Sequence, residues 1–315
     1  ASAGVGAPGG AGPAPALSRH QDLPIARVVA AHGRHAFIET DAGQRVQCHL
    51  RGRKTDLVVG DRVRWQPAGD EGVIEAVEPR LNLLFRQDDW RTKSFAANLD
   101  QILLLVAGEP VFSESQLTRA LIAAESAGIA AHIGLNKIDK PSAAAARERL
   151  QPYRDMGVQV LQFALKADPQ SALAQLQPLL QGKVTLVLGP SGTGKSTLIN
   201  LLVPQAQAQV GEISQALNSG RHTTTSTLWY WLDAQRSGAL IDSPGFQEFG
   251  LHHIDAAQLA LLMPDLRAAL GDCRFYNCLH RHEPGCGVRA AVERGEITPQ
   301  RYRLYCEILD ELTPR

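Results

Sequence analysis

The sequence lacks the features that mark membrane proteins and proteins held to nucleic acid by overall charge. No apolar run approaches the roughly 18 to 20 residues that cross a bilayer, and the longest, such as 102–107, has the length of a strand. Lys plus Arg and Asp plus Glu each number 32, so the chain has no net charge to attract nucleic acid. These absences exclude a membrane protein. They also predict no DNA partner and require any RNA contact to come from a local patch.

Cysteine is scarce, and its distribution is uneven. Five cysteines among 315 residues are too few for a disulfide framework. Three of them, Cys273, Cys278 and Cys286, lie within fourteen residues, which favours a metal site. The first seventeen residues are almost entirely Ala, Gly and Pro and lack the features of a secretory signal or a transit peptide. We therefore predict a disordered tail over 1–20 and a cytoplasmic protein.

The region after this tail has the pattern of a small β-barrel. Five short β-rich pieces with turns between them and no helical stretch predict a closed barrel over 21–92, of the oligonucleotide-binding (OB) type. An SH3-like barrel would give nearly the same pattern. The expected strands are 25–31, 35–40, 45–50, 62–67 and 72–77. Arg51, Arg53 and Lys54 form a basic cluster, which is either a solvated surface or a contact for RNA phosphates.

From about residue 93 the pattern changes to apolar strands that alternate with helices. This alternation predicts a mostly parallel sheet covered on both faces, over 93–254. The expected strands are 101–107, 129–135, 158–163, 184–188 and 239–242, and the expected helices are 114–127, 142–155 and 195–202. The last part, 255–315, is predicted to be helical with a cysteine-rich interruption. Thr298 and Pro299 begin its final helix, which runs to about Leu312.

A phosphate-binding loop follows the strand over 184–188. Residues 189–196 fit G-x-x-x-x-G-K-[ST] and open a helix, which is the context that the motif requires. Lys195 would neutralise the β and γ phosphates, and Ser196 would ligate Mg²⁺. The predicted nucleotide contacts are Gly189, Pro190, Ser191, Gly192, Thr193, Gly194, Lys195, Ser196 and Thr197.

The base is predicted to be guanine. Asn136, Lys137 and Asp139 form Asn-Lys-x-Asp at the end of a strand. The Asp139 carboxylate can accept hydrogen bonds from the N1 and N2 donors that guanine presents and adenine lacks. Together with the phosphate loop, this motif indicates a GTPase.

Two further motifs complete the expected GTP site. Asp242 and Gly245 occupy D-x-x-G, where the carboxylate would reach Mg²⁺ through water and the glycine N–H would contact the γ-phosphate. In the 220–225 loop, a threonine would complete the Mg²⁺ shell, and we favour Thr224 over Thr223. Asn136 precedes the phosphate loop by about fifty residues, the reverse of the ordinary order. We therefore predict a circularly permuted G domain.

The clustered cysteines offer ligands for one structural zinc ion. Cys273, Cys278 and Cys286 supply three thiolates, and His280 or His282 supplies an imidazole. Four such ligands close a tetrahedral site without leaving a position for water. Cys48 and Cys306 are spare thiols.

Taken together, these motifs resemble the ribosome small-subunit-dependent GTPase A (RsgA) family. The resemblance covers nearly all of residues 24–312, including Val59-Gly60-Asp61 in the barrel and Ala97-Asn98-Leu99-Asp100-Gln101 at its exit. It selects His280 as the zinc imidazole. It implies a GTPase that binds the small ribosomal subunit and its rRNA late in maturation, with ribosome-stimulated hydrolysis to GDP. We also expect a monomer.

Three positions bear on the rate of hydrolysis and the affinity for guanine. Phe246 follows D-x-x-G where Ras-like enzymes have a water-orienting Gln, so we expect slow intrinsic hydrolysis. The resemblance gives His222 as the residue that assists; contacting RNA or stabilising the loop is an equal alternative. The resemblance also implies a loop near Phe163 in which a backbone N–H contacts guanine O6. Phe163 takes the place of the family's polar residue there, so we expect Ala164 or Leu165 to make the contact and the affinity for guanine to be weakened.

Three rival functions stay open at this point. A permuted GTPase acting on the large subunit would not need this barrel and zinc motif. A GTP-gated RNA-binding module with incidental hydrolysis is consistent with Phe246. A metal chaperone would need a transferable metal, to which a closed Cys3His site is poorly suited.

Overall fold

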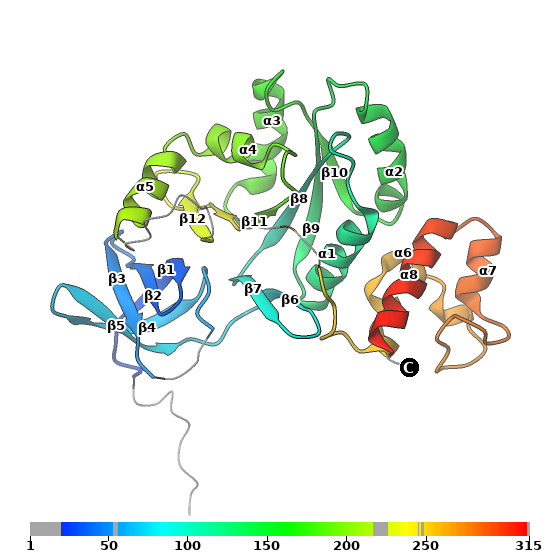
Figure 1. The fold of residues 1–315 in the computed structure, drawn as a ribbon, viewed down its shortest axis with the longest axis horizontal. Coiled ribbons are helices and arrows are strands. Elements are labelled where there is room, and N and C mark those ends of the chain that lie inside the picture. The colour runs from blue at the N-terminus through cyan, green and yellow to red at the C-terminus, as the bar shows by residue number, and fades with distance from the viewer. Residues whose placement is uncertain (1–19, 53–55, 217–225, 245, 247–248, 314–315) are drawn as a thin grey trace, which may run out of the picture.

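The N-terminal part of the protein is a closed five-stranded barrel. The computed structural model describes residues 20–52, 56–216, 226–244, 246 and 249–313. The barrel strands are β1 (Ile25–His32), β2 (His35–Glu39), β3 (Arg45–Leu50), β4 (Arg62–Ala68) and β5 (Glu71–Val77). They pair in the order β1-β2-β3-β5-β4, and β4 returns to β1 to close the barrel (Figure 1). The predicted barrel is confirmed, with strand bounds within two residues of those expected.

The barrel core follows from the alternation of its strands. Inward-facing residues such as Val28, Ile38, Cys48 and Ile74 are buried together with Trp65. Position 72 has no room for a side chain, because a Cβ atom on Gly72 would come within 2.5 Å of the Cys48 sulfur. The barrel therefore has its own apolar interior.

The central part is a sheet of five parallel strands with one antiparallel edge strand. In sheet order the strands are β10 (Gln159–Gln162), β9 (Ala130–Asn136), β8 (Gln101–Ala107), β11 (Val184–Leu188), β13 (Ala239–Asp242) and β12 (Leu228–Trp231). Every residue of β8 is buried, as expected for a parallel strand covered on both faces. The predicted parallel sheet is confirmed. The strand β12 is an addition to the prediction.

Helices cover both faces of this sheet. The helices α1 (Glu114–Ser126) and α2 (Ala143–Asp155) pack on one face. The helices α3 (Pro169–Leu180), α4 (Lys195–Leu202) and α5 (Ala206–Ala216) pack on the other. The sheet thus lies between two apolar layers (Figure 1).

The barrel and the central sheet share one hydrogen-bonded ladder. Ala30 of β1 pairs with Leu228 of β12 in antiparallel register. The guanidinium of Arg27 lies over the rings of Trp229 and Trp231, 4.7 and 5.2 Å from their centroids. The indole of Trp231 donates to the Glu39 carboxylate at 2.7 Å. The two sheets therefore form a single eleven-stranded sheet.

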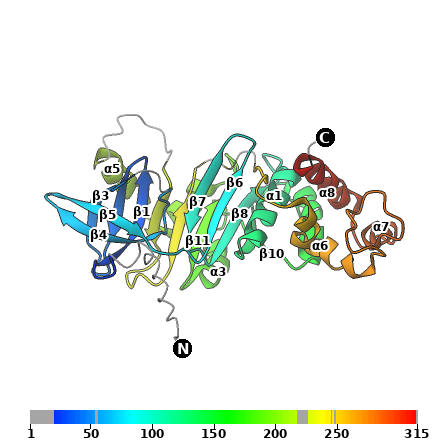
Figure 2. The ribbon, with the colours of Figure 1, turned by 90° about the horizontal axis from the view of Figure 1, so that it is seen from below.

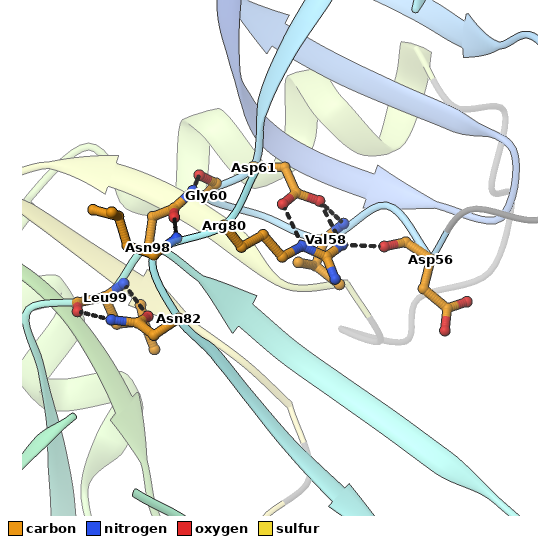
Figure 3. A network of polar contacts seen from close by, with 9 residues as sticks. Asp56, Val58, Gly60, Asp61, Arg80, Asn82, Asn98 and Leu99 are labelled. Carbon is orange, nitrogen blue, oxygen red and sulfur yellow. Dashed lines mark hydrogen bonds and ion pairs between the residues drawn. The ribbon is translucent and has the colours of Figure 1, made fainter. Parts of the chain in front are cut away.

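A hairpin, β6 (Leu83–Gln87) and β7 (Thr92–Ala97), connects the barrel to β8. Its base is fastened by paired asparagines (Figure 3). Asn98 accepts from the N–H of Leu81 and donates to the carbonyl of Gly60, and Asn82 both accepts from and donates to the backbone of Leu99. The predicted boundary between residues 92 and 93 lies at the start of β7; the domain division stays a prediction.

An arginine completes the same joint on the barrel side. Arg80 donates to both carboxylate oxygens of Asp61, at 2.7 and 2.9 Å, and to the carbonyl of Asp56 (Figure 3). The Asp61 carboxylate also accepts from the N–H of Val58. The Val59-Gly60-Asp61 and Ala97–Gln101 sequences therefore meet in one polar joint between the barrel and the central sheet.

The C-terminal part is a small helical module. Its helices are α6 (Pro264–Arg267), α7 (Gly287–Glu293) and α8 (Pro299–Leu312), with 3-10 turns at Ala256–Gln258, Ala260–Leu262 and Leu270–Asp272. The hydroxyl of Thr298 caps α8, as predicted. Figure 2 shows barrel, central sheet and C-terminal helices side by side in a row. Among the helices of the described residues, none has the length and apolar character that crossing a bilayer requires.

Candidate functional site

The candidate GTP site is a cavity at the carboxyl edge of the parallel sheet. Loops after β9, β11 and β13 meet there, which is where ligands bind in open α/β sheets. The cavity has a volume of about 930 Å³. Predicted residues that line it are Asn136, Lys137, Asp139, Gly189, Pro190, Ser191, Gly192, Gly194, Lys195, Ser196, Thr197 and Asp242. Residues far apart in the chain are thus brought to one place.

The phosphate loop has the backbone geometry that its glycines permit. Gly192 and Gly194 have positive φ angles of 82° and 102°. A Cβ atom on Gly194 would also come within 2.3 Å of the Asn136 amide nitrogen. Helix α4 begins directly afterwards at Lys195, so its N-terminal N–H groups face the cavity.

Thr193 is the one predicted phosphate-loop residue that does not line the cavity. Its side chain is buried, and its hydroxyl donates to the carbonyl of Pro190 at 2.8 Å. The carbonyl of Thr193 accepts from the Asn136 amide at 2.9 Å. Thr193 therefore stabilises the conformation of the phosphate loop from its buried side and connects the loop to the end of β9.

Lys137 makes a second tie between the base-recognition motif and the phosphate loop. Its ammonium donates to the carbonyl of Gly192 at 2.7 Å and to that of Glu109 at 3.0 Å. Lys137 itself has a φ of 62°, which turns the chain sharply after β9. This turn places Asp139 on the cavity wall.

The loop expected at guanine O6 begins at Phe163, whose side chain is not part of the cavity wall. Phe163 is buried and lies against Gly134, where a Cβ atom would come within 2.9 Å of its ring. It is a core residue and does not line the cavity. The N–H of Leu165 donates to the Asn136 side-chain oxygen at 3.0 Å. Leu165, Lys166 and Ala167 form the wall here.

Two lysines hold the D-x-x-G segment. Lys195 donates to the carbonyl of Ser243 at 2.7 Å and forms an ion pair with Asp242 at 2.9 Å. Lys93, from the hairpin strand β7, donates to the carbonyl of Pro244 at 3.2 Å. Lys195 and Asp242 were predicted, but Lys93 was not, because a single lysine in a short strand carries no local signal.

Several predicted residues lie outside the described part of the chain. These are Arg53, Lys54, His222, Thr223, Thr224 and Gly245. Phe246 is described and lines the cavity, and its ring contacts Phe249 with centroids 6.1 Å apart. An aromatic ring offers no hydrogen-bond acceptor for an attacking water, so the wall at this point is apolar.

The cavity wall also includes residues that the motifs did not identify. Glu109, Lys140, Lys166, Ala167, Ser226 and Pro244 complete the lining. Pro244 lies inside D-x-x-G, and Lys166 follows directly on the expected guanine loop. The others reach the cavity through loops whose courses depend on the tertiary fold.

The second candidate site is a cluster of Cys273, Cys278, His280 and Cys286. Their ligand atoms all lie within 4.8 Å of one another. His280 Nδ1 is 3.5 Å from the sulfurs of Cys273 and Cys286. A tetrahedral zinc ion with Zn–S of about 2.3 Å and Zn–N of about 2.0 Å requires a sulfur–nitrogen separation of about 3.5 Å. The donor set and spacing fit one such ion.

The protonation of the cluster is linked to the presence of a cation. Burial and the neighbouring thiols of Cys286 and Cys273 raise the pKa of Cys278 to about 12. Three thiolates would therefore not form here without a positive charge. Burial lowers the pKa of His280, which favours the neutral ring that ligates metals.

The ligand loop is held by backbone and tyrosine contacts. N–H groups of Gly287 and Arg289 donate to the sulfurs of Cys273 and Cys286. Tyr302 and Tyr305 of α8 donate to the carbonyls of His280 and Leu279 at 2.7 and 2.8 Å. These contacts orient the ligands from the helix behind them.

A carboxylate supports the same loop. Burial acts to raise the pKa of Glu283, but backbone N–H donors, including those of Leu279 and Arg281 at 2.9 and 3.0 Å, lower it to about 2. The carboxylate is therefore charged at neutral pH and replaces water as the partner of these N–H groups.

Comparison with known proteins gives a consistent family. A family profile described as RsgA GTPase matches residues 77–252. The chain is 60% identical over 291 residues to the small ribosomal subunit biogenesis GTPase RsgA of Variovorax paradoxus, covering 91% of this chain and 92% of that one. It is 51% identical over 302 residues to the protein of the same name from Burkholderia pseudomallei, covering 95% and 96%.

Solved structures show the same fold. YloQ, described as a circularly permuted GTPase, matches with a TM-score of 0.68 and 28% identity, covering 94% of this chain and 98% of that one. YjeQ from Thermotoga maritima matches with a TM-score of 0.72 and 30% identity, covering 93% and 99%. The predicted permuted GTPase fold and the GTP-hydrolysing activity are confirmed. The chain belongs to the RsgA GTPase family.

Proposed function

We propose that this GTPase acts in the biogenesis of the small ribosomal subunit and that the subunit stimulates its GTP hydrolysis. The observation that carries the proposal is full-length similarity, at 60% identity, to a relative named for that role. The match extends over the barrel and the C-terminal module as well as the GTPase part. These flanks argue against the large subunit as the partner.

In this proposal, different residues of the cavity bind the phosphates and the Mg²⁺ ion. Lys195 and the N-terminus of α4 bind the β and γ phosphates and neutralise charge in the transition state. Ser196 and Asp242, which line the same cavity, would hold Mg²⁺ together with Thr224 or Thr223. The bound Mg²⁺ supplies further charge neutralisation. Gly245 would contact the γ-phosphate.

Guanine selection is assigned to the end of β9. Asp139 accepts from the guanine N1 and N2 donors, while Asn136 and Lys137 fasten the phosphate loop beside it. Intrinsic hydrolysis is slow because Phe246 cannot orient water. We assign the assisting role to His222, whose imidazole can accept a proton or align the attacking water.

The Cys3His cluster holds one structural zinc ion in this proposal. The fit of the sulfur–nitrogen distances supports zinc, and all four positions are taken by side chains, which leaves none for substrate. The metal then stabilises the loop between α6 and α7 and has no part in hydrolysis.

The flanking parts bind the rRNA of the subunit, and the protein acts as a cytoplasmic monomer with GTP and GDP as its small ligands. The basic cluster of Arg51, Arg53 and Lys54 supplies positive charge, although Arg51 pairs with Glu75 and the chain as a whole has no net charge. The three-part division at residues 92/93 and 254/255 is part of this proposal.

The test is GTP hydrolysis by the full chain alone and with purified small subunits, large subunits or whole ribosomes. We expect strong stimulation by small subunits and little by large ones. The Lys195→Ala variant is the control, because it should lose hydrolysis under every condition. Stimulation by large subunits alone, or by neither subunit, would contradict the proposal.

A further inference from the structure

Lys93 lies beside the GTP site on an element that belongs to no nucleotide-binding motif. It is in β7, opposite Arg86 of β6. Its ammonium donates to the carbonyl of Pro244 at 3.2 Å and lies 5.3 Å from the centre of the Phe95 ring. A partly buried lysine is thus held by a hydrogen bond on one side and an aromatic face on the other.

Within the described part of the chain, the ammonium of Lys93 contacts a carbonyl and an aromatic ring and forms no ion pair with a carboxylate. Burial lowers the pKa of Lys93, and the positive charges of Arg86 and Lys195 lower it further. Burying an ammonium beside another cation costs free energy. If this position only had to fill space, an apolar residue would therefore be more stable than a lysine.

The partner of Lys93 is the D-x-x-G segment itself. Lys195 donates to the carbonyl of Ser243, and Lys93 donates to the next carbonyl, that of Pro244. Two lysines from different elements therefore hold successive peptide units directly after Asp242. Because each peptide unit is planar, fixing its carbonyl also fixes its orientation.

The hairpin that carries Lys93 is anchored firmly enough to act as a support. Its base is fastened by Asn82 and Asn98 (Figure 3). Near its tip, Gln87 donates to the carbonyl of Gly250 at 3.0 Å. Phe95 stacks on Phe249 with centroids 5.4 Å apart. The hairpin thus contacts the chain on the C-terminal side of D-x-x-G as well as at Pro244.

We propose that Lys93 is a positioning residue for GTP hydrolysis, which holds the Pro244 carbonyl so that the segment after Asp242 is correctly placed against Lys195 and the γ-phosphate. Its effect depends on the third phosphate because the segment it holds belongs to the γ-phosphate end of the site. GDP, which lacks that phosphate, is bound without its help. The proposal deepens the proposed function and rests only on the assignment of this cavity as the GTP site.

The test compares Lys93→Met with the wild type in two measurements on the full chain without ribosomes. Single-turnover hydrolysis at saturating GTP should slow about tenfold, because a charged donor to the carbonyl is lost. The affinity for a fluorescent GDP should stay within about twofold. The Lys93→Arg variant should recover part of the hydrolysis rate, since a guanidinium can donate to the same carbonyl.

Arg91→Met is the matched control. Arg91 is an exposed cation on the same hairpin, and its replacement should change neither measurement. Three results would each overturn the proposal: an unchanged rate in Lys93→Met, a parallel loss of GDP affinity, or an arginine variant no faster than the methionine variant. If small subunits failed to stimulate hydrolysis, the proposed function would be contradicted. The comparison of the Lys93 variants would still be valid, because it is made without ribosomes.

Discussion

Arg301 donates to both carboxylate oxygens of Asp265, at 2.8 and 2.9 Å, from a side chain that is only 3% exposed. It also donates to the Thr118 hydroxyl at 2.9 Å and lies over the Tyr153 ring. Burial alone would lower the pKa of Arg301, but the Asp265 carboxylate outweighs it and raises the pKa. One guanidinium on α8 therefore joins α6 of the C-terminal module to α1 and α2 of the GTPase part.

We expect Arg301→Met to destabilise the protein by about 3 kcal/mol, because it leaves the Asp265 charge buried without its partner. The free energy of unfolding in urea measures this loss. Arg303, an exposed residue on the same helix, provides the control, and Arg303→Met should stay within about 0.5 kcal/mol of the wild type. Equal effects of the two substitutions would argue against a structural role for the Arg301–Asp265 pair.

Metal content tests the Cys3His cluster. Elemental analysis of the purified chain should find one zinc ion per molecule, and Cys286→Ala should lose it and lower the melting temperature. Cys306→Ala is the control, since that sulfur lies outside the cluster and its loss should leave the zinc content unchanged. Full zinc retention by the Cys286 variant would show that the assignment of ligands is wrong.

Guanine recognition is expected to depend on Asp139. In Asp139→Asn an amide replaces a carboxylate that accepts two donors, so GTP affinity should fall about a hundredfold. Xanthosine triphosphate, which has an oxygen in place of the guanine amino group, should bind the variant better than GTP does. Nucleotide titration measures both affinities. Unchanged preference for GTP would contradict the role given to Asp139.

A comparison of two glycines with positive φ distinguishes the cost of a steric clash from the cost of an unfavourable backbone conformation. Gly60 has a φ of 93°, and a Cβ atom there would lie 2.1 Å from the Ala97 carbonyl oxygen. Gly33 has a φ of 60° and nothing within 4 Å of such an atom. Gly33→Ala should therefore cost about 1 kcal/mol, whereas Gly60→Ala should cost several kcal/mol more. The free energy of unfolding in urea measures both costs. Similar costs for the two substitutions would contradict the prediction and show that the joint in Figure 3 can shift to accommodate a Cβ atom.

The buried thiol of Cys48 predicts a dependence of stability on alkaline pH. Burial raises the pKa of Cys48 from 9.0 to about 12. Above pH 9 the unfolded chain loses this proton while the folded chain keeps it, so the folded state binds more protons and its stability falls as pH rises. Cys48→Ala removes this contribution. The stability difference between the wild type and the variant, measured from pH 8 to pH 10, should therefore shrink with pH; a constant difference would contradict the prediction.

Local sequence patterns were sufficient where a single segment determines its own structure. The phosphate loop predicts a helix from Lys195 to Leu202, and α4 has those bounds. The barrel strands were predictable from alternation and turns. Asn136 could be placed because the end of a buried strand is a defined position in a parallel sheet. In each case the pattern that allows the prediction lies within one short segment, even where the side chain, as in Asn136, bonds to a residue far along the chain.

The remaining features depend on contacts between distant segments. The hairpin β6–β7 was missed because its partner surface, at Phe249 and Gly250, lies more than 150 residues away. Phe163 was identified only as a replacement in the guanine loop; its burial against Gly134 of the neighbouring strand depends on the tertiary fold. Lys93 illustrates the same difficulty, since only the fold brings it to Pro244.

The ladder between β1 and β12 has a consequence for solubility. Without the barrel, Leu228 of β12 would lose its strand partner, and Trp229 and Trp231 would lose the cover of Arg27 and Glu39. An exposed, apolar strand edge is a template for pairing with another chain. We therefore expect the barrel to limit self-association, and a chain shortened to the GTPase part alone to aggregate.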